Sequence, residues 1–151
     1  MDRPHNKRLR HGRFSEQGRL YLLTTTVADR VPIFREMCLA RLVIVQFRQV
    51  QDEGLANSLA WVVMPDHIHW LIELRQTSLN TLMQRFKSRS ARLVNAAGGR
   101  QGRLWQPGFH DRALRREDDI LEVARYIVAN PLRAGLVQRL GDYPHWDAVW
   151  L

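Results

Sequence analysis

The stretch LAWVVMPDHIHWLIEL, residues 59–74, contains the pattern that decides the fold. Residues 59–64 and 67–74 are runs of β-branched, aromatic and other apolar residues, and a Pro-Asp pair separates them. Two such runs on either side of a short turn are typical of a β-hairpin. The second run also contains two histidines, His67 and His69, although a strand that only has to pack needs no imidazoles. The stretch therefore predicts a hairpin with a functional feature on its second strand.

The two histidines are expected to share one face of their strand, because alternate side chains of a strand point the same way. They would lie about 7 Å apart along the strand, close enough to approach one cation, while Ile68, Trp70 and Ile72 would point the other way, under the helices. Histidine is the commonest metal-ligating side chain, and a chain with one cysteine does not indicate a closed zinc site. An open metal site with room for water and a phosphate oxygen is favoured. Two solvent-facing or hydrogen-bonded histidines are the alternative.

Hydrophobic periodicity outward from the hairpin indicates further strands and helices. Strands are expected at residues 19–27, 59–64, 67–74 and 109–114, and helices at residues 36–53, 77–98 and 116–130. This βαββαβα order is typical of an α+β, ferredoxin-like fold, in which an antiparallel sheet has helices on one face and the other face free for a ligand. After a basic N-terminal arm at 1–18, one domain is expected at 19–151. The aromatic tail, residues 143–151, is expected to dock on that domain.

The charge of the chain indicates a polyanionic partner. Lysine and arginine number 23 against 15 aspartate and glutamate, which gives a net charge of +8. Nucleic acid is the simplest such partner, and an anionic membrane surface is the second. No apolar run approaches the roughly 20 residues of a spanning helix, and the single cysteine, Cys38, is expected in the core of a protein from a reducing compartment. We therefore expect a cytoplasmic, nucleoid-associated protein with no membrane partner.

A phosphate-binding track is indicated between residues 75 and 110, where seven lysines and arginines stand without any acidic residue. A solvated helix face is the alternative, but such faces usually carry both signs of charge. Trp105 is expected either to stack on a base or to lie in the core. The candidate DNA-binding residues are Arg8, Arg10 and Arg13 of the arm together with Arg85, Arg89, Arg92, Arg100 and Arg103.

The C-terminal helix is expected to present a tyrosine away from its own core. At about 100° per residue, its apolar face is expected to consist of Ile120, Leu121, Ala124, Ile127 and Val128. Tyr126 falls off that face, and Asn130, four residues later, lies beside it. A phenol with a pKa of about 10 is a weak nucleophile, but a divalent cation that polarises a phosphodiester would offset this weakness. The amide oxygen of Asn130 suits Mg²⁺ or Mn²⁺ as a further ligand; a surface or interface aromatic is the alternative reading of Tyr126.

These motifs together resemble one protein family. His67-Ile68-His69 is a His-hydrophobic-His (HUH) motif, and YIVANPLRAGLV, residues 126–137, is similar to the tyrosine helix of the single-tyrosine HUH transposases. In particular, the chain resembles the REP-associated tyrosine transposases. The resemblance extends over nearly the whole chain, through TTTVADR at 24–30 with Phe34, MPDH at 64–67, Trp105-Gln106 and FHDR at 109–112.

The resemblance implies a chemistry and a substrate. His67 and His69 would bind a divalent metal, Mg or Mn, with Asn130 as a further ligand where several relatives carry Gln. Tyr126 would attack a DNA phosphate and form a 5′-phosphotyrosine with a free 3′-OH. The substrates would be single-stranded and hairpin DNA at REP-like sequences, and the enzyme a monomer or a homodimer. This metal-dependent nickase and strand transferase is the leading expectation; a non-catalytic basic module that binds hairpin DNA or RNA, and a metal phosphodiesterase without a covalent step, are the alternatives.

Overall fold

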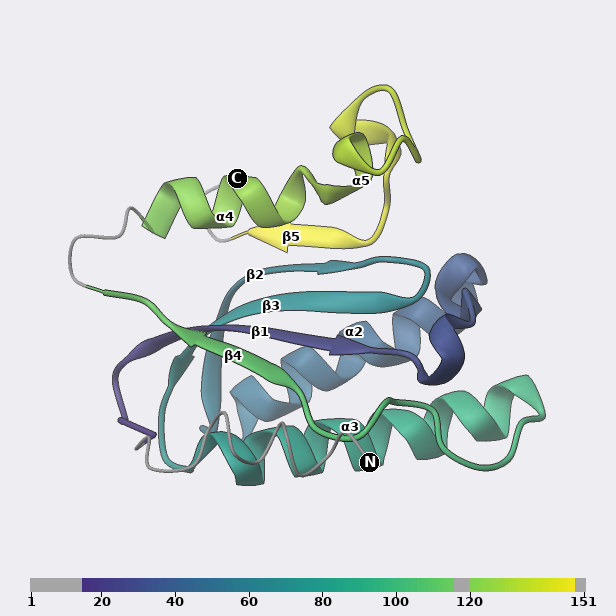
Figure 1. Ribbon diagram of the computed structural model, residues 1–151. Coiled ribbons are helices and arrows are strands. Elements are labelled where there is room, and N and C mark those ends of the chain that lie inside the picture. Colours follow the sequence, from purple (N-terminus) through teal and green to yellow (C-terminus); the bar gives the residue numbers. More distant parts are fainter. Residues whose placement is uncertain (1–14, 116–119, 149–151) are drawn as a thin grey trace.

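The computed structural model describes residues 15–115 and 120–148, which form a five-stranded antiparallel sheet in the order β4-β1-β3-β2-β5 (Figure 1). The strands are β1 (Leu20–Thr26), β2 (Ala56–Val63), β3 (His67–Leu74), β4 (His110–Ala113) and β5 (Trp146–Ala148). The helices are α2 (Met37–Asp52), α3 (Leu79–Gly98), α4 (Ile120–Val128) and α5 (Asn130–Arg133), with 3₁₀ turns at Ala28–Arg30, Ile33–Arg35 and Leu140–Asp142. The arginines of the predicted arm, Arg8, Arg10 and Arg13, lie outside the described residues.

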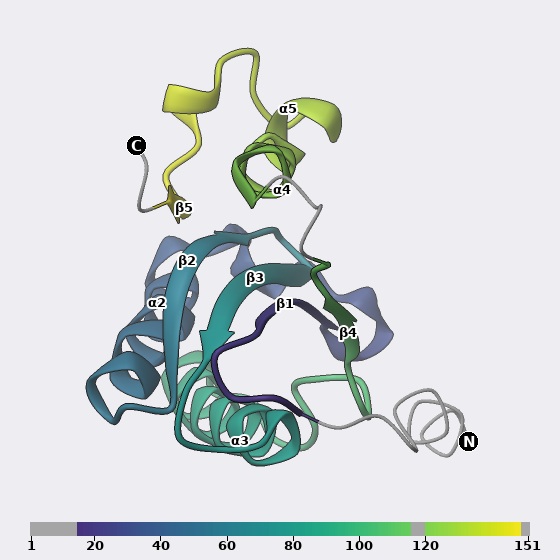
Figure 2. The ribbon, with the colours of Figure 1, turned by 90° about the vertical axis from the view of Figure 1, so that its left-hand side faces the viewer.

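The ferredoxin-like α+β prediction is confirmed, because β1, α2, β2, β3, α3 and β4 follow the expected βαββαβ order. Helices α2 and α3 lie side by side on one face of the sheet (Figure 2). Their apolar stripes meet over Trp70 of β3, whose ring lies 4.7 Å from Phe47 of α2 and 5.0 Å from Phe86 of α3, measured between centroids. This aromatic contact fixes the helix-covered face of the hairpin strand and leaves its histidines on the opposite face.

The boundaries of α3 agree closely with the prediction because the sequence contains a signal at each end. Ser78 is the N-cap, and its side-chain oxygen accepts a hydrogen bond from the Thr81 backbone N–H. Gly99 ends the helix with φ 64°, a left-handed conformation that glycine adopts at little cost. The helix therefore runs from Leu79 to Gly98, on the sheet face opposite the histidines.

The sequence predicted that the second face of the sheet would be free, but helix α4 covers part of it (Figure 2). The reason is that Leu71 of β3 shares the face of His67 and His69 and needs an apolar cover. Helix α4 supplies that cover with Ala124, Ile127 and Val128. The face is therefore divided into an apolar half under α4 and a polar half around the histidines.

The C-terminal region departs from the prediction in two ways. The helix expected to run to Asn130 ends at Val128, and a short helix, Asn130–Arg133, follows it. Pro131 lies in the first turn of this second helix, where its missing N–H is not needed. The described part of the aromatic tail, residues 143–148, docks as expected, and it does so through strand β5, which pairs with β2 in an antiparallel register.

Two further expectations on burial are wrong. Ile120 is 37% exposed; periodicity predicts the direction of a side chain, whereas burial also requires an element opposite it. Cys38 is exposed in the first turn of α2, beside the buried stripe of that helix. None of the helices in the described ranges has the length and the apolar composition needed to span a bilayer.

Candidate functional site

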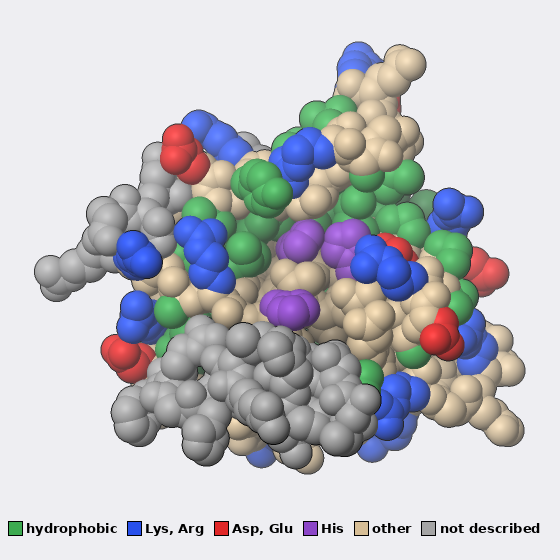
Figure 3. Space-filling model, in the orientation of Figure 1, with side chains coloured by type: hydrophobic (Ala, Val, Ile, Leu, Met, Phe, Trp, Pro, Cys, Tyr) green, Lys and Arg blue, Asp and Glu red, His purple; other side chains and the backbone are tan. Residues whose placement is uncertain are grey.

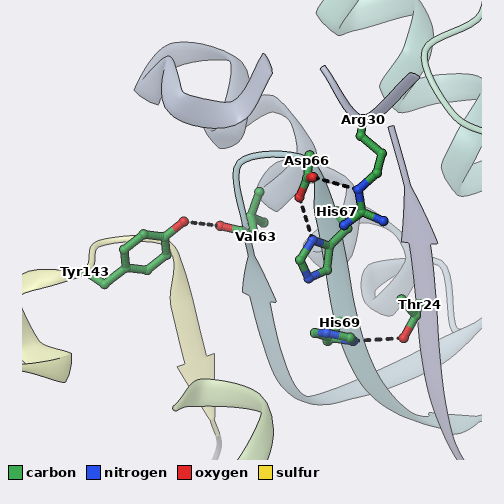
Figure 4. A network of polar contacts seen from close by, with 7 residues as sticks. All are labelled: Thr24, Arg30, Val63, Asp66, His67, His69 and Tyr143. Atoms are coloured by element: carbon green, nitrogen blue, oxygen red, sulfur yellow. Dashed lines mark hydrogen bonds and ion pairs between the residues drawn. The ribbon is translucent and has the colours of Figure 1, made fainter. Parts of the chain in front are cut away.

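The two histidines lie together on the polar half of the second sheet face (Figure 4). Their ring centroids are 4.9 Å apart, with the rings at 81° to each other. Ile68, Trp70 and Ile72 are fully buried on the other side of β3, as alternation predicts. Figure 3 shows histidine side chains gathered at the centre of this face, with lysine and arginine side chains around them.

His67 is held by a carboxylate from the β2–β3 turn. Asp66 Oδ1 lies 2.7 Å from His67 Nδ1, and the Arg30 side chain donates from Nε to Asp66 Oδ2 over 3.2 Å (Figure 4). Burial acts to raise the pKa of Asp66, but the hydrogen bond and charge of His67, with the charge of Arg30, outweigh it and lower that pKa. Asp66 is therefore ionised at neutral pH, and a proton on His67 Nδ1 leaves the lone pair of Nε2 for a ligand.

His69 is held from the neighbouring strand. The register places Thr24 of β1 opposite His69, and Thr24 Oγ1 lies 2.8 Å from His69 Nδ1. Burial, with the positive charges of His67 and Arg133, lowers the pKa of His69 to about 4. The ring is thus neutral at physiological pH, which is the form that binds metals.

A third histidine shares this face. Thr24 is opposite His69 on one side and opposite His110 of β4 on the other, so the three side chains form one row across the sheet. His110 is exposed. Among the described residues, however, no three His, Cys, Asp or Glu side chains come close enough together to hold a metal ion. A metal bound by the histidine pair would need further ligands of another type.

Tyr126 is the accessible phenol of the three tyrosines in the chain, all of which lie in the described ranges. It is 59% exposed on α4. Tyr21 is buried, and its hydroxyl accepts a hydrogen bond from the Glu16 backbone N–H. The Tyr143 hydroxyl donates to the Val63 carbonyl over 2.6 Å, and burial raises the pKa of Tyr143 to about 12.

The residues that follow Tyr126 turn back toward it. Arg133 of α5 stacks on the tyrosine, with its guanidinium carbon 3.7 Å from the ring centroid, and its Nη2 donates to the Tyr126 carbonyl over 2.7 Å. Asn130 uses its amide nitrogen to cap the end of α4, donating to the Ile127 carbonyl over 3.0 Å. Within the described residues its Oδ1 accepts no hydrogen bond, so that oxygen is available to a ligand.

The predicted basic track lies on a different surface from the histidines. Arg85, Arg89 and Arg92 belong to α3, on the far side of the sheet. Arg89 also has an acidic partner that the local sequence does not contain, because its Nη1 lies 2.7 Å from Glu53 Oε1 at the end of α2. Arg100 and Arg103, the other two candidate DNA-binding residues of the track, are exposed in the loop after α3. Trp105 is 3% exposed and donates from Nε1 to Ser90 Oγ, so it is a core residue and not a base-stacking platform.

Sequence reasoning missed three residues that hold the site. Asp66 stands directly before His67 in the turn, a position from which a carboxylate reaches the next side chain, so the signal was present. Arg133 follows Tyr126 by seven residues, which in one continuous helix would separate them by about 10.5 Å along the axis; their contact depends on the break between α4 and α5. Thr24 gives no such signal, because its contact with the histidine depends on the register of β1 and β3.

Comparison with known proteins identifies the family of this chain. Residues 18–130 match the family described as "Transposase IS200 like". The REP-associated tyrosine transposase of Escherichia coli K12 is 31% identical over 85 residues, which cover 56% of this chain and 50% of that protein, so the chain spans about half of this relative. A protein of Haemophilus influenzae Rd named as a candidate REP-associated tyrosine transposase is 24% identical over 140 residues, 85% of this chain and 79% of the relative.

A solved structure has the same fold. A REP-associated tyrosine transposase bound to a REP hairpin superposes with a TM-score of 0.74 at 22% identity, over 90% of this chain and 80% of that one. The family match includes His67, His69, Tyr126 and Asn130. The chain therefore belongs to the IS200-like transposase family and is similar to the REP-associated tyrosine transposases within it.

Proposed function

We propose that the protein cleaves single-stranded DNA next to hairpins and rejoins it through a 5′-phosphotyrosine on Tyr126, with the help of a divalent metal. The observation that carries this proposal is the accessible phenol of Tyr126 on a helix packed over the same sheet face as His67 and His69. The REP hairpin bound by the structural relative supports hairpin DNA as the substrate class. The net charge of +8 suits such a polyanion, and a DNA substrate of this kind supports action at the nucleoid, in the cytoplasm.

The residues present fit a divalent metal. The hydrogen bonds of His67 and His69 engage Nδ1 of each ring, which leaves both Nε2 atoms for coordination. Asn130 Oδ1 is the further candidate ligand, an oxygen of the kind that Mg²⁺ or Mn²⁺ prefers. When bound, the metal would polarise the scissile phosphate and offset the charge that develops on it.

The covalent step is a displacement at phosphorus. Tyr126 Oη forms a bond to the phosphorus while the bond from phosphorus to the 3′-oxygen breaks, and the phenol proton leaves to water while the departing 3′-oxygen takes one up. The 5′-phosphate then remains on the tyrosine, so attack by another 3′-OH regenerates the phenol and joins the strands. Helix α4 packs on the sheet of its own chain. This favours a monomer that uses its own tyrosine over a homodimer in which each subunit supplies its tyrosine helix to the other.

The test is to trap the covalent adduct. Wild type, Tyr126→Phe and Tyr143→Phe are incubated with end-labelled single-stranded DNA that contains a hairpin, in the presence of Mn²⁺, and run on a denaturing gel. A shifted, protease-sensitive band should form with wild type and Tyr143→Phe and be absent with Tyr126→Phe, which keeps the ring and loses only the hydroxyl. A band with Tyr126→Phe would mean another nucleophile. Hairpin binding without a band from any protein would favour the alternative, a non-catalytic binding module.

A further inference from the structure

Arg133 is a cation placed directly against the proposed nucleophile, Tyr126. Its guanidinium carbon lies over the Tyr126 ring, 3.7 Å from the centroid, and its Nη2 donates to the Tyr126 carbonyl over 2.7 Å. Both contacts come from α5, which turns back over the end of α4 because Pro131 starts a new helix there. Tyr126 and Arg133 therefore stay together although the helix between them is interrupted at Ala129.

The charge of Arg133 has no carboxylate partner among the described residues. Other arginines of this chain do have one: Arg30 pairs with Asp66, Arg89 with Glu53 and Arg139 with Asp142. An exposed guanidinium without a counter-ion, on a face that must receive a phosphodiester, is an anion-binding group.

We propose that Arg133 binds the scissile phosphate and holds it near the Tyr126 hydroxyl; this inference rests on the proposed function. The stacked geometry suits the task. One N–H of the guanidinium is used by the Tyr126 carbonyl, and the remaining edge of the planar fork is free to donate two parallel hydrogen bonds to phosphate oxygens. Stacking also restricts the tyrosine ring. Lysine would keep the charge but lose both the fork and the stack.

Phosphate neutralisation tests this contact apart from cleavage. In the Tyr126→Phe protein, which keeps the stacked ring and cannot form the adduct, affinity is measured for a series of hairpin oligonucleotides that each carry one neutral methylphosphonate in the single-stranded part. The series is repeated with Arg133→Gln, Arg133→Lys and the control Arg139→Gln in the same background. Arg139 is an exposed arginine beyond α5 that pairs with Asp142.

At one phosphate, neutralisation should weaken binding about tenfold when Arg133 is present and leave it nearly unchanged in Arg133→Gln. Either change removes the same charge-assisted contact, so making both changes costs no more affinity than making one. Arg133→Lys should restore part of this sensitivity, and Arg139→Gln should behave as the parent. That phosphate should be the one to which wild type becomes linked. Equal sensitivity of parent and Arg133→Gln at every position, or coupling only at a different phosphate, would overturn the inference. If Arg133 and one phosphate are coupled in binding but wild type forms no adduct, Arg133 is an anion-binding residue and the proposed covalent function is refuted instead.

Discussion

Removing the carboxylate behind His67 should weaken metal binding without unfolding the protein. Asp66 Oδ1 is 2.7 Å from His67 Nδ1, a short contact that orients the ring and keeps the proton on Nδ1. Loss of such a carboxylate typically costs about 10–100-fold in metal affinity. Asp66→Asn retains a neutral acceptor, so we expect roughly tenfold weaker Mn²⁺ binding, and Asp66→Ala should approach roughly 100-fold.

The measurement is Mn²⁺ titration followed by electron paramagnetic resonance or calorimetry, at pH 7 where the His69 ring is neutral. Glu73→Gln is the matched control, because Glu73 is a carboxylate on the same strand that pairs with Arg75 at the end away from the histidines. The control should bind Mn²⁺ as wild type does. If Asp66→Ala also binds within about twofold of wild type, the turn carboxylate does not orient a metal ligand and the reasoning is refuted.

Two further predictions concern pH and salt. His69 has a pKa of about 4 in the folded protein, against an ordinary value of 6.5. Between these two pH values the unfolded chain binds a proton at His69 that the folded chain does not bind. The free energy of unfolding of the metal-free protein should therefore fall as the pH drops from 6.5 to 4, by at most about 3 kcal/mol. Urea unfolding at several pH values should give a flatter dependence on pH for His69→Gln. Part of the slope should remain, because burial and the charge of Arg41 also lower the pKa of His145. Equal slopes for mutant and wild type would contradict this. For salt, Arg85→Gln with Arg92→Gln should reduce the slope of log affinity against log salt by about 0.7 per lost contact to a single strand, whereas Arg89→Gln should change it less, since Arg89 is paired with Glu53. An unchanged slope for the double variant would place the DNA track elsewhere.

The hairpin and α3 could be predicted because their information is local. The period-two pattern predicted β3 over His67–Leu74, and Ser78 and Gly99 marked the ends of α3. The placement of the histidines on one face, opposite Trp70, follows from the same alternation.

What could not be predicted depends on contacts between distant segments. Arg89 pairs with Glu53, a residue 36 positions earlier in the sequence. A segment without acidic residues therefore did not give a surface without acidic residues. Strand β5 is three residues long, too short for a periodic pattern, and exists because β2 offers it an edge. The contact of Thr24 with His69 depends on strand register, which local composition does not determine.

The identity of the nucleophile is tested most directly by mass spectrometry of the trapped protein–DNA complex after nuclease and trypsin digestion. Cleavage after Arg125 and Arg133 releases residues 126–133, YIVANPLR, in which Tyr126 is the single tyrosine. We predict that this peptide carries the residual nucleotide through a phosphodiester on Tyr126, and that the peptides containing Tyr21 and Tyr143 are unmodified. A nucleotide on either of those tyrosines, or an unmodified 126–133 peptide in a complex that survives denaturation, would contradict the central claim.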